Sequence, residues 1–574
     1  MKRKHKLLVY LGITLIAFLY FFVTAPTINP LYPDGAFFWA VLVTIYLAAG
    51  QLMKGGLKVS AAGGLFSIDF DKEKKVKFKK WAVVTIIVIW AIYFLTMLIS
   101  SPLFFYKAYR DQLPKAEQVE FSSDMQTLDI SQVPVVDQAL ATQLASKKLG
   151  ENAALGSQVE LGEPTIQEVD GELVWVVPLH HSGFFKWITN LEGSKGYIKI
   201  SATNLQDMEY VGDYNIKIQP NCYLLDDLER HVRFGPGAWT GITDYSFELD
   251  DTGRPYWVVT TYKNLRGFAL PEADGILLVD AQTGDIQQYG MDEIPEWVDR
   301  VQPEDFIINQ INNQGEYVHG IFNFANTDKT KTSDGHAIIY NGGDCYLFTG
   351  LTSVGSDESA IGFMMVDMVN KQPVFYSMSG ATEEAAQRSA EGKVQNYGYR
   401  ASFPIILNIS NQPTYFMTLK DSSSQLVKQY AMVSVKNLNV VGVGDTPKAA
   451  QDDYLKAMQE IGTSIDLGQG DAAPAETKEM TGTVERISWN TSGDTVEYTM
   501  ILSDHYDQIF TVPSEVSAEL PVTQPGDQIS ITYEADGIGA VYRVTQFDNL
   551  WIGEGAPAKR QTQQTSQTEN EIQN

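Results

Sequence analysis

The sequence predicts an α+β protein that is anchored by three N-terminal transmembrane helices and ends in a small β-barrel. Three observations support this prediction: three long apolar runs lie within residues 1–104, helical segments alternate with groups of strands between residues 130 and 462, and five evenly spaced short strands follow a Gly/Ala/Pro linker. A chain of 574 residues is too long for one hydrophobic core. Several domains are therefore expected.

Each apolar run is uncharged and long enough to cross a hydrocarbon core of about 30 Å. The runs occupy residues 7–24, 36–53 and 81–100. A cleaved signal peptide is disfavoured for the first run, because two further spans follow it. The spans hold no ionisable side chain, which argues against a proton or ion pathway through them. They are interpreted as an anchor.

Basic residues decide the predicted orientation. The first 104 residues contain twelve Lys/Arg and four Asp/Glu, and eight of the lysines lie in the 54–80 loop. The link between the first two spans has no basic residue, so the positive-inside rule places the N-terminus and the 54–80 loop in the cytoplasm. We therefore expect a multi-pass protein of the cell membrane whose chain after Ser100 is extracytoplasmic.

The remaining 470 residues are strongly acidic. Of the total net charge of −27, the first 104 residues account for +8, which leaves −35 for the ectodomain. Such a surface repels a polyphosphate backbone, so nucleic acid is not an expected partner. Besides the membrane itself, we expect a protein or a cell-wall component outside the cytoplasm as the partner.

Three segments of the ectodomain match one another at a fixed spacing. In each, an alternating apolar strand begins at a glycine, a polar turn follows, and a second strand carries a tyrosine fourteen positions after the glycine; the segments are Gly196–Tyr210, Gly275–Tyr289 and Gly362–Tyr376. This pattern is typical of a β-hairpin. With the helical stretches between them, it predicts a tandem unit of one helix and three antiparallel strands, used about four times with a degenerate fourth copy.

The second of these segments resembles the hairpin of PepSY-type domains. In that family a strand ends in an Asp-x-x-Thr-Gly-x-[Ile/Val] turn, and here the turn is Asp280-Ala-Gln-Thr-Gly-Asp-Ile286. The stretch 250–259 is similar to the family's first hairpin, and the match covers about residues 225–300. Asn370-Lys371 and Leu205-Gln206 replace Thr-Gly in the other copies. The resemblance implies extracytoplasmic, non-catalytic modules of bacterial cell-envelope proteins, often regulators, and supplies no catalytic residue.

The predicted organisation has eight parts. They are a membrane anchor (1–104), a first α+β module (105–220), a PepSY-like module (221–300), a third module (301–380), a degenerate fourth module (381–462), a linker (463–479), an OB-like or SH3-like barrel (480–552) and a disordered tail (553–574). The barrel has Arg486 and Arg543 as its only Lys or Arg residues, which disfavours an oligonucleotide site.

Cys345 is the strongest candidate for a catalytic nucleophile. A cysteine hydrolase needs a thiolate beside an imidazole, and His336 lies nine residues before it. A cell-envelope cysteine hydrolase or transpeptidase using this pair is therefore an alternative function. A disulfide between Cys222 and Cys345, or two inert thiols, are the structural interpretations, and they are favoured because the spacing matches no cysteine-enzyme signature.

A long polar loop between two expected strands is the candidate binding site. Its residues are Thr352, Ser353, Ser356, Asp357 and Glu358. The loop lacks Lys and Arg and so cannot be a P-loop, but polar loops on a rigid scaffold favour recognition. No metal site or cofactor is expected. The sequence thus predicts a non-catalytic, membrane-anchored scaffold that binds or regulates cell-envelope components, with an accessory subunit of a membrane complex as a further alternative.

Overall fold

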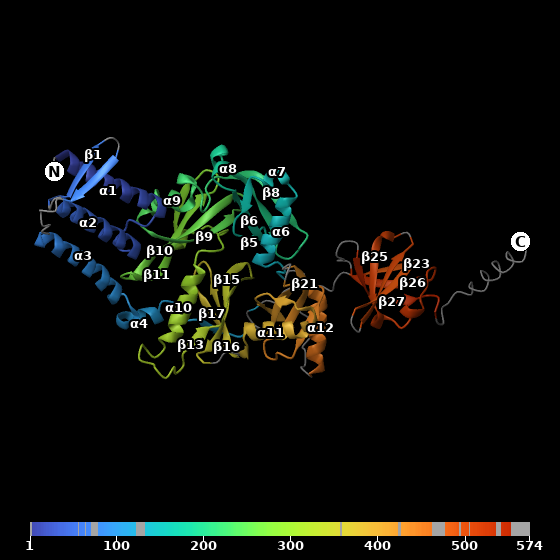
Figure 1. The fold of residues 1–574 in the computed structure, drawn as a ribbon. Helices are drawn as coiled ribbons and strands as arrows, with labels where there is room; N and C mark the ends of the chain where they lie inside the picture. The colour runs from blue at the N-terminus through green and yellow to red at the C-terminus, as the bar shows by residue number, and fades with distance from the viewer. Residues whose placement is uncertain are drawn as a thin grey trace, which may run out of the picture. The chain divides into compact units, whose positions relative to one another are not determined.

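The computed structural model divides the chain into two compact units, Met1–Asp466 and Leu467–Asn574, which we call the N-terminal and the C-terminal unit (Figure 1). It describes all residues apart from 1–2, 55–56, 63–64, 71–78, 122–124, 126–132, 356–358, 423–425, 462–476, 493–494, 504, 535–540 and 553–574. The predicted class is confirmed at its coarser level: the protein is a mixed α+β chain with three apolar N-terminal helices and a closed C-terminal barrel.

The N-terminal unit begins with α1 (Arg3–Thr24), α2 (Pro33–Lys54) and α3 (Lys80–Ile99). All three are long and apolar enough to cross a membrane. A short hairpin, β1 (Leu57–Ala62) and β2 (Leu65–Phe70), lies between α2 and α3, and α4 (Pro102–Arg110) follows α3. The helices contact one another through polar and aromatic side chains, as in the hydrogen bond from Trp90 Nε1 to Thr44 Oγ1 at 3.0 Å.

Four sheets follow within the described part of this unit, antiparallel apart from one parallel pair in the third. The first sheet contains β4 (Val159–Leu161), β5 (Thr165–Val169), β6 (Glu172–His181), β7 (Ser194–Ser201) and β8 (Met208–Ile216). The second contains β9 (Gly241–Leu249), β10 (Pro255–Arg266), β11 (Ala269–Asp280) and β12 (Ile286–Gly290).

The third sheet contains β13 (Thr330–Thr332), β14 (Ala337–Asn341), β15 (Asp344–Ser353), β16 (Ser359–Asp367) and β17 (Pro373–Ala381), with β3 (Glu117–Val119) added parallel to β17. The fourth contains β18 (Arg400–Ala401), β19 (Ile405–Ile409), β20 (Gln412–Lys420), β21 (Val427–Ser434) and β22 (Val441–Gly444). In three of the four sheets two short strands pair with the same long strand: β4 and β5 with β6, β13 and β14 with β15, and β18 and β19 with β20.

Each sheet therefore has at least one strand more than the three that the sequence predicts. The additional strands β5, β14 and β19 are only five residues long, and each enters a two-residue turn. Both central residues of these turns have positive φ, as at Gly342 (66°) and Gly343 (94°), which is the backbone geometry that suits a tight hairpin. Strands so short give little periodic signal, which explains why they are missed.

The three Gly-to-Tyr segments form the antiparallel pairs β7–β8, β11–β12 and β16–β17. Each glycine lies where the strand register shifts, and there the neighbouring strand comes very close. A Cβ atom on Gly275 would lie 2.2 Å from the carbonyl oxygen of Tyr289, and the corresponding distance is 2.4 Å between Gly362 and Tyr376. The glycine spacing thus has a backbone cause. That the segments are copies of one family module stays a prediction.

Helices separate the sheets along the chain. They are α6 (Gln138–Gly150), α7 (Ala153–Gly156), α8 (Phe184–Thr189), α9 (Leu228–Arg233), α10 (Glu304–Glu316), α11 (Glu383–Lys393) and α12 (Pro447–Glu460). Side-chain oxygens cap several N-termini: Asp137 accepts from Leu140 N, and Thr446 accepts from Ala449 N directly before Pro447.

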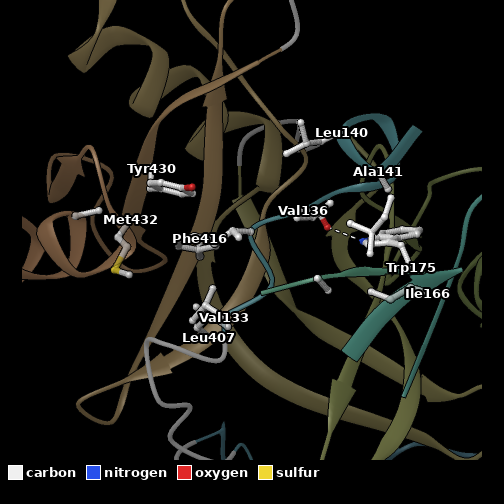
Figure 2. Close-up of a cluster of buried hydrophobic side chains, with 14 of the residues drawn as sticks. Val133, Val136, Leu140, Ala141, Ile166, Trp175, Leu407, Phe416, Tyr430 and Met432 are labelled. Atoms are coloured by element: carbon white, nitrogen blue, oxygen red, sulfur yellow. Dashed lines mark hydrogen bonds between the residues drawn. The ribbon is translucent and has the colours of Figure 1, made fainter. Parts of the chain in front are cut away.

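The four sheets pack against one another in a closed cycle. Because side chains alternate along β6, Val174 and Val176 face a core shared with the second sheet, whereas Trp175 faces a core that also contains Phe416 of the fourth sheet. Figure 2 shows Val136 between these two rings, with Trp175 Nε1 donating to its carbonyl oxygen at 2.7 Å. The third and fourth sheets share another core around Phe363. The second and third meet at Val301, whose amide donates to Met368 O at 2.9 Å. The sheets consequently surround a common centre.

The C-terminal unit is a closed barrel of five strands in the part of it that is described. The strands are β23 (Thr477–Ser492), β24 (Thr495–Leu502), β25 (His505–Pro513), β26 (Gln528–Glu534) and β27 (Val541–Asn549), in the order β23-β24-β25-β27-β26. Phe510, Leu520 and Ile529 fill its core. Five strands closed in this way fit an OB-like barrel and leave no unpaired edge.

Candidate functional site

A cavity of about 990 Å³ between the first, third and fourth sheets is the candidate site, and Arg300 and Glu304, which follow the second sheet in the chain, complete its wall. Its walls include the five-residue strands β5, β14 and β19 of these sheets, together with the segments that enter them. Charged or polar side chains reach it from different parts of the chain: Glu168, Arg300, Glu304, His336 and Tyr340. A large concave site with a few converging polar groups is the usual form of a ligand pocket.

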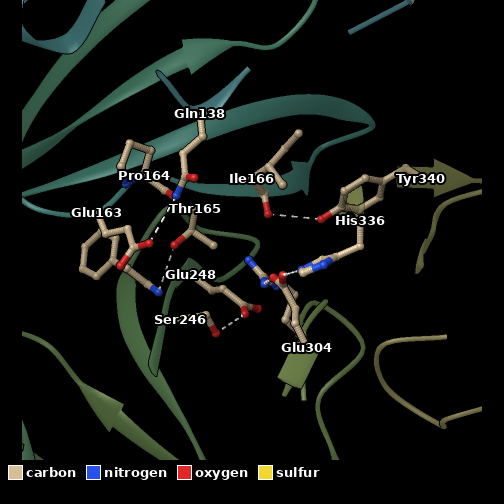
Figure 3. A network of polar contacts seen from close by, with 12 residues as sticks. Gln138, Glu163, Pro164, Thr165, Ile166, Ser246, Glu248, Glu304, His336 and Tyr340 are labelled. Carbon is tan, nitrogen blue, oxygen red and sulfur yellow. Dashed lines mark hydrogen bonds and ion pairs between the residues drawn. The ribbon is translucent and has the colours of Figure 1, made fainter. Parts of the chain in front are cut away.

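Glu304 organises one side of this cavity. It stands in the first turn of α10, forms an ion pair with Arg300, and accepts a hydrogen bond from His336 Nε2 at 2.7 Å (Figure 3). Burial by itself would raise the pKa of Glu304, but the hydrogen bond from His336 and the charge of Arg300 outweigh burial and hold its pKa below the ordinary value. The carboxylate is therefore charged and linked to two basic groups.

Behind this wall lies a second acidic group, Glu248 of β9, whose side chain is fully buried. Burial, and then the nearby charge of Asp299, raise the pKa of Glu248 to about 8. Its oxygens accept from Ser246 Oγ at 2.5 Å and from the amide of Asp299 at 3.0 Å. At neutral pH this carboxyl holds its proton.

Asp299 connects three of the sheets. Its Oδ2 accepts from the amide of Glu168 in β5 at 3.0 Å and from the hydroxyl of Tyr340 in β14 at 3.0 Å. Its own amide donates to Glu248 of the second sheet. Burial raises the pKa of Asp299 to about 6 despite those hydrogen bonds. The network fixes the mutual positions of the first, second and third sheets beside the cavity.

Two buried oxygens of the fourth sheet complete the lining. Asn408 Oδ1 and Thr418 Oγ1 have no hydrogen-bond partner among the described residues, although both side chains are buried and line the cavity. The amide nitrogen of Asn408 is satisfied, since it donates to Met125 O at 2.8 Å. An unpaired buried acceptor is costly, so these atoms are suited to receive a ligand's donors.

The predicted binding loop lies elsewhere. Thr352 and Ser353 end β15 and pair with β13, Thr352 being buried and Ser353 exposed. Neither belongs to the lining of the central cavity as far as that lining is described. Ser356, Asp357 and Glu358 lie outside the described residues. The described part of the loop thus lies outside the lining of the central cavity, and a binding site in this loop stays a prediction.

The two cysteines are free and buried, so the possible disulfide is not formed. Burial raises the pKa of the Cys222 thiol to about 11 and places the pKa of the Cys345 thiol well above its ordinary value. The predicted proximity of His336 and Cys345 is also not found. The turn at Gly342 and Gly343 pairs Cys345 with Tyr340 across β14 and β15, while His336 stands before β14 and bonds Glu304.

Sequence reasoning singled out His336 but missed its acidic partners. Glu304 is 32 positions away along the chain and Glu248 is 51 positions from Asp299, so no local motif joins them. A signal was present in Phe247-Glu248-Leu249, where a carboxyl interrupts an apolar strand. Among the residues that the structure describes, no group of three His, Cys, Asp or Glu side chains could hold a metal ion.

Comparisons with known proteins give no family. No protein-family profile and no curated protein matches the chain. A levansucrase mutant from B. megaterium is 10% identical, with a TM-score of 0.19, over 76% of this chain and 93% of its own. A GH43 β-1,3-galactosidase solved with galactodeoxynojirimycin is 10% identical, with a TM-score of 0.17, over 66% of this chain and 92% of its own. Scores this low carry no argument about fold or function.

Proposed function

We propose that this protein is a membrane-anchored, extracytoplasmic scaffold that binds or regulates a cell-envelope component without catalysis, and that the central cavity holds the ligand. The cavity is the observation that carries the proposal. It is about 990 Å³ in volume and is lined by residues from three sheets of one chain. A cavity of this size accommodates a drug-sized molecule or a short segment of a larger partner.

The lining indicates a polar ligand. Arg300 and His336 offer donors, whereas Glu168 offers a carboxylate and Asn408 and Thr418 offer unpaired oxygens. A ligand that carries both donors and acceptors satisfies these groups, and an apolar one would leave them desolvated and unpaired.

The burial of the possible catalytic side chains favours a binding role over a catalytic one. The thiol of Cys345 is buried and protonated, and Glu248 is fully buried behind the wall rather than exposed in the cavity. A nucleophile or a general acid has to reach its substrate. The extracytoplasmic location is supported by the basic 54–80 loop, and the regulatory role by the PepSY-like turn at Asp280.

Photo-crosslinking in intact cells tests the proposal. A photoreactive side chain replaces Phe403, which lines the cavity, and the matched control replaces Tyr397, an exposed ring of the same sheet region outside it. We expect a discrete adduct from position 403 that is absent at position 397. The proposal fails if neither position, or both positions equally, yield an adduct.

A further inference from the structure

We propose that the N-terminal unit rests on the surface of the bilayer through two aromatic prominences beside its anchor, one on α8 and one in the loop after α10. The proposal rests on the membrane anchoring stated under the proposed function and goes beyond it, since it assigns a lipid-binding surface to the ectodomain itself. Two sets of contacts support it: residues that follow the first prominence contact the end of α1, and the second prominence contacts α4, which follows α3.

The first prominence, which we call the α8 patch, consists of Phe184, Phe185, Ile188, Leu224 and Leu225. All five are exposed, and Phe185 reaches 80%. The helix is oriented by Trp187, which is buried and donates from Nε1 to Asp226 Oδ2 at 2.8 Å. With Trp187 turned inward, α8 presents its other large apolar side chains to the outside. A short helix with one apolar face of this kind is typical of an interfacial helix.

The α8 patch is joined to the end of α1. The ring of Phe184 lies 5.3 Å from that of Tyr223, which precedes the two leucines of the patch. A few residues later, Phe234 lies 5.4 Å from the ring of Phe21, and Arg230 lies 5.7 Å above the ring of Phe22. Phe21 and Phe22 belong to the last turn of α1. The segment that follows the patch in the chain therefore packs against the end of this candidate spanning helix.

The second prominence, the Phe322 loop, spans residues 317–329. Phe322 and Phe324 are 74% and 83% exposed there. The loop contacts α4: the rings of Tyr317 and Tyr109 are 6.1 Å apart, and a Cβ atom on Gly320 would lie 3.3 Å from the ring of Tyr106. Because α4 follows α3 after two residues, this loop lies beside the end of another spanning helix.

Like the two prominences, the helix α4 exposes large apolar side chains. Leu103 and Phe104 are more than half exposed, while Lys107 and Arg110 lie in its last turn. Apolar side chains at the level of the lipid headgroups, flanked by basic ones that extend to phosphates, are typical of segments at a membrane interface.

A bilayer is the occupant that these observations favour. Single exposed apolar residues are ordinary on a protein surface, but clusters of them indicate an interaction site. Here the clusters adjoin the ends of two helices that are apolar enough to span a membrane. Lipid surrounds the ends of helices that span a membrane. The helix α8 also has no acidic residue, whose charge would be unfavourable at the boundary between headgroups and acyl chains.

Fluorescence quenching by spin-labelled lipid tests the inference on the full chain in nanodiscs. Single cysteines replace Phe185 and Phe324 and carry an environment-sensitive fluorophore; the unsubstituted protein, whose own cysteines are buried, measures background labelling. Leu95 of α3 provides a lipid-facing reference, and Tyr397, which is 66% exposed and follows α11, provides the matched control.

We expect quenching at positions 185 and 324 to reach roughly half of that at position 95, because an interfacial helix buries its apolar face about 5–10 Å into the headgroup and acyl boundary. Position 397 should show only background quenching. The inference is overturned if positions 185 and 324 behave like 397 and are open to aqueous iodide, a result that would favour a protein partner instead. Loss of quenching at position 95 as well would refute the anchor itself.

Discussion

Replacing Glu248 by glutamine should remove a specific part of the protein's pH dependence. In the folded protein this carboxyl keeps its proton up to about pH 8, whereas an ordinary glutamate in the unfolded chain releases it near 4.5. The folded state therefore binds more protons than the unfolded state between these two values. Its contribution to stability is fully present below about pH 4.5 and is lost as the pH rises through 8.

The magnitude follows from the same two values. The gap between 4.5 and about 8 corresponds to roughly 5 kcal/mol, at about 1.36 kcal/mol for each pH unit. Glutamine keeps the shape of the side chain and has no charge to bury, but its one acceptor oxygen serves either Ser246 Oγ or the amide of Asp299 and not both. The variant should thus be about 1–3 kcal/mol less stable than the parent at pH 4.5, where one donor is left unpaired, and the difference should shift in favour of the variant by several kcal/mol between pH 4.5 and 9.

Thermal unfolding of the full chain in detergent, measured from pH 4.5 to 9, is the assay. The difference between the parent and the Glu248→Gln variant isolates this group from the other carboxyls. Glu293→Gln changes an exposed carboxyl nearby and should leave the profile unaltered. A Glu248→Gln effect that is the same at both ends of the pH range would refute the assigned protonation state.

Three further predictions concern packing, an ion pair and the thiols. Gly275→Ala should lower stability by roughly 2–4 kcal/mol, because its Cβ atom would meet the backbone of β12 at 2.2 Å; Gly290→Ala, with open space around it, should not. Lys371→Met should cost about 3 kcal/mol by leaving the Glu272 carboxylate with only neutral donors, and Glu272→Gln in addition should recover part of that loss. A thiol reagent at pH 8 should label neither native cysteine and should label both after unfolding.

Unfolding midpoints measure the first two of these effects, and the absorbance of the released reagent measures the third. Equal destabilisation by both glycine variants would contradict the close strand contact at Gly275. An unchanged midpoint for Lys371→Met would show that water screens the pair. Failure of the denatured chain to react would indicate a disulfide instead of the two free thiols.

Structural features that depend on residues close together in the sequence were predictable. The spans 7–24, 36–53 and 81–100 correspond closely to the candidate spans Lys6–Thr24, Pro33–Met53 and Lys80–Ile99, because about twenty apolar residues in a row form their own signal. The barrel has the five predicted strands for the same reason, since each strand alternates over several residues.

Contacts between distant residues were not predictable. The proposed pairing of Cys345 with His336 assumed that nine residues of separation could close across a hairpin, but the turn at Gly342 and Gly343 pairs the cysteine with Tyr340. The predicted binding loop was chosen for its composition, whereas the cavity lies where the short strands β5, β14 and β19 of three sheets converge. The composition of a segment does not indicate which strand of a sheet will line the cavity.

By itself, the sequence determined the three apolar helices, the α+β class and the five-stranded barrel, because hydropathy and strand periodicity act over windows of five to twenty residues. The tertiary structure alone decided that four sheets pack in a cycle and that Glu248, Asp299 and Tyr340 meet beside one cavity. The physical reason is that burial, and with it the protonation of a carboxyl, depends on neighbours that the chain brings together only after its sheets have packed.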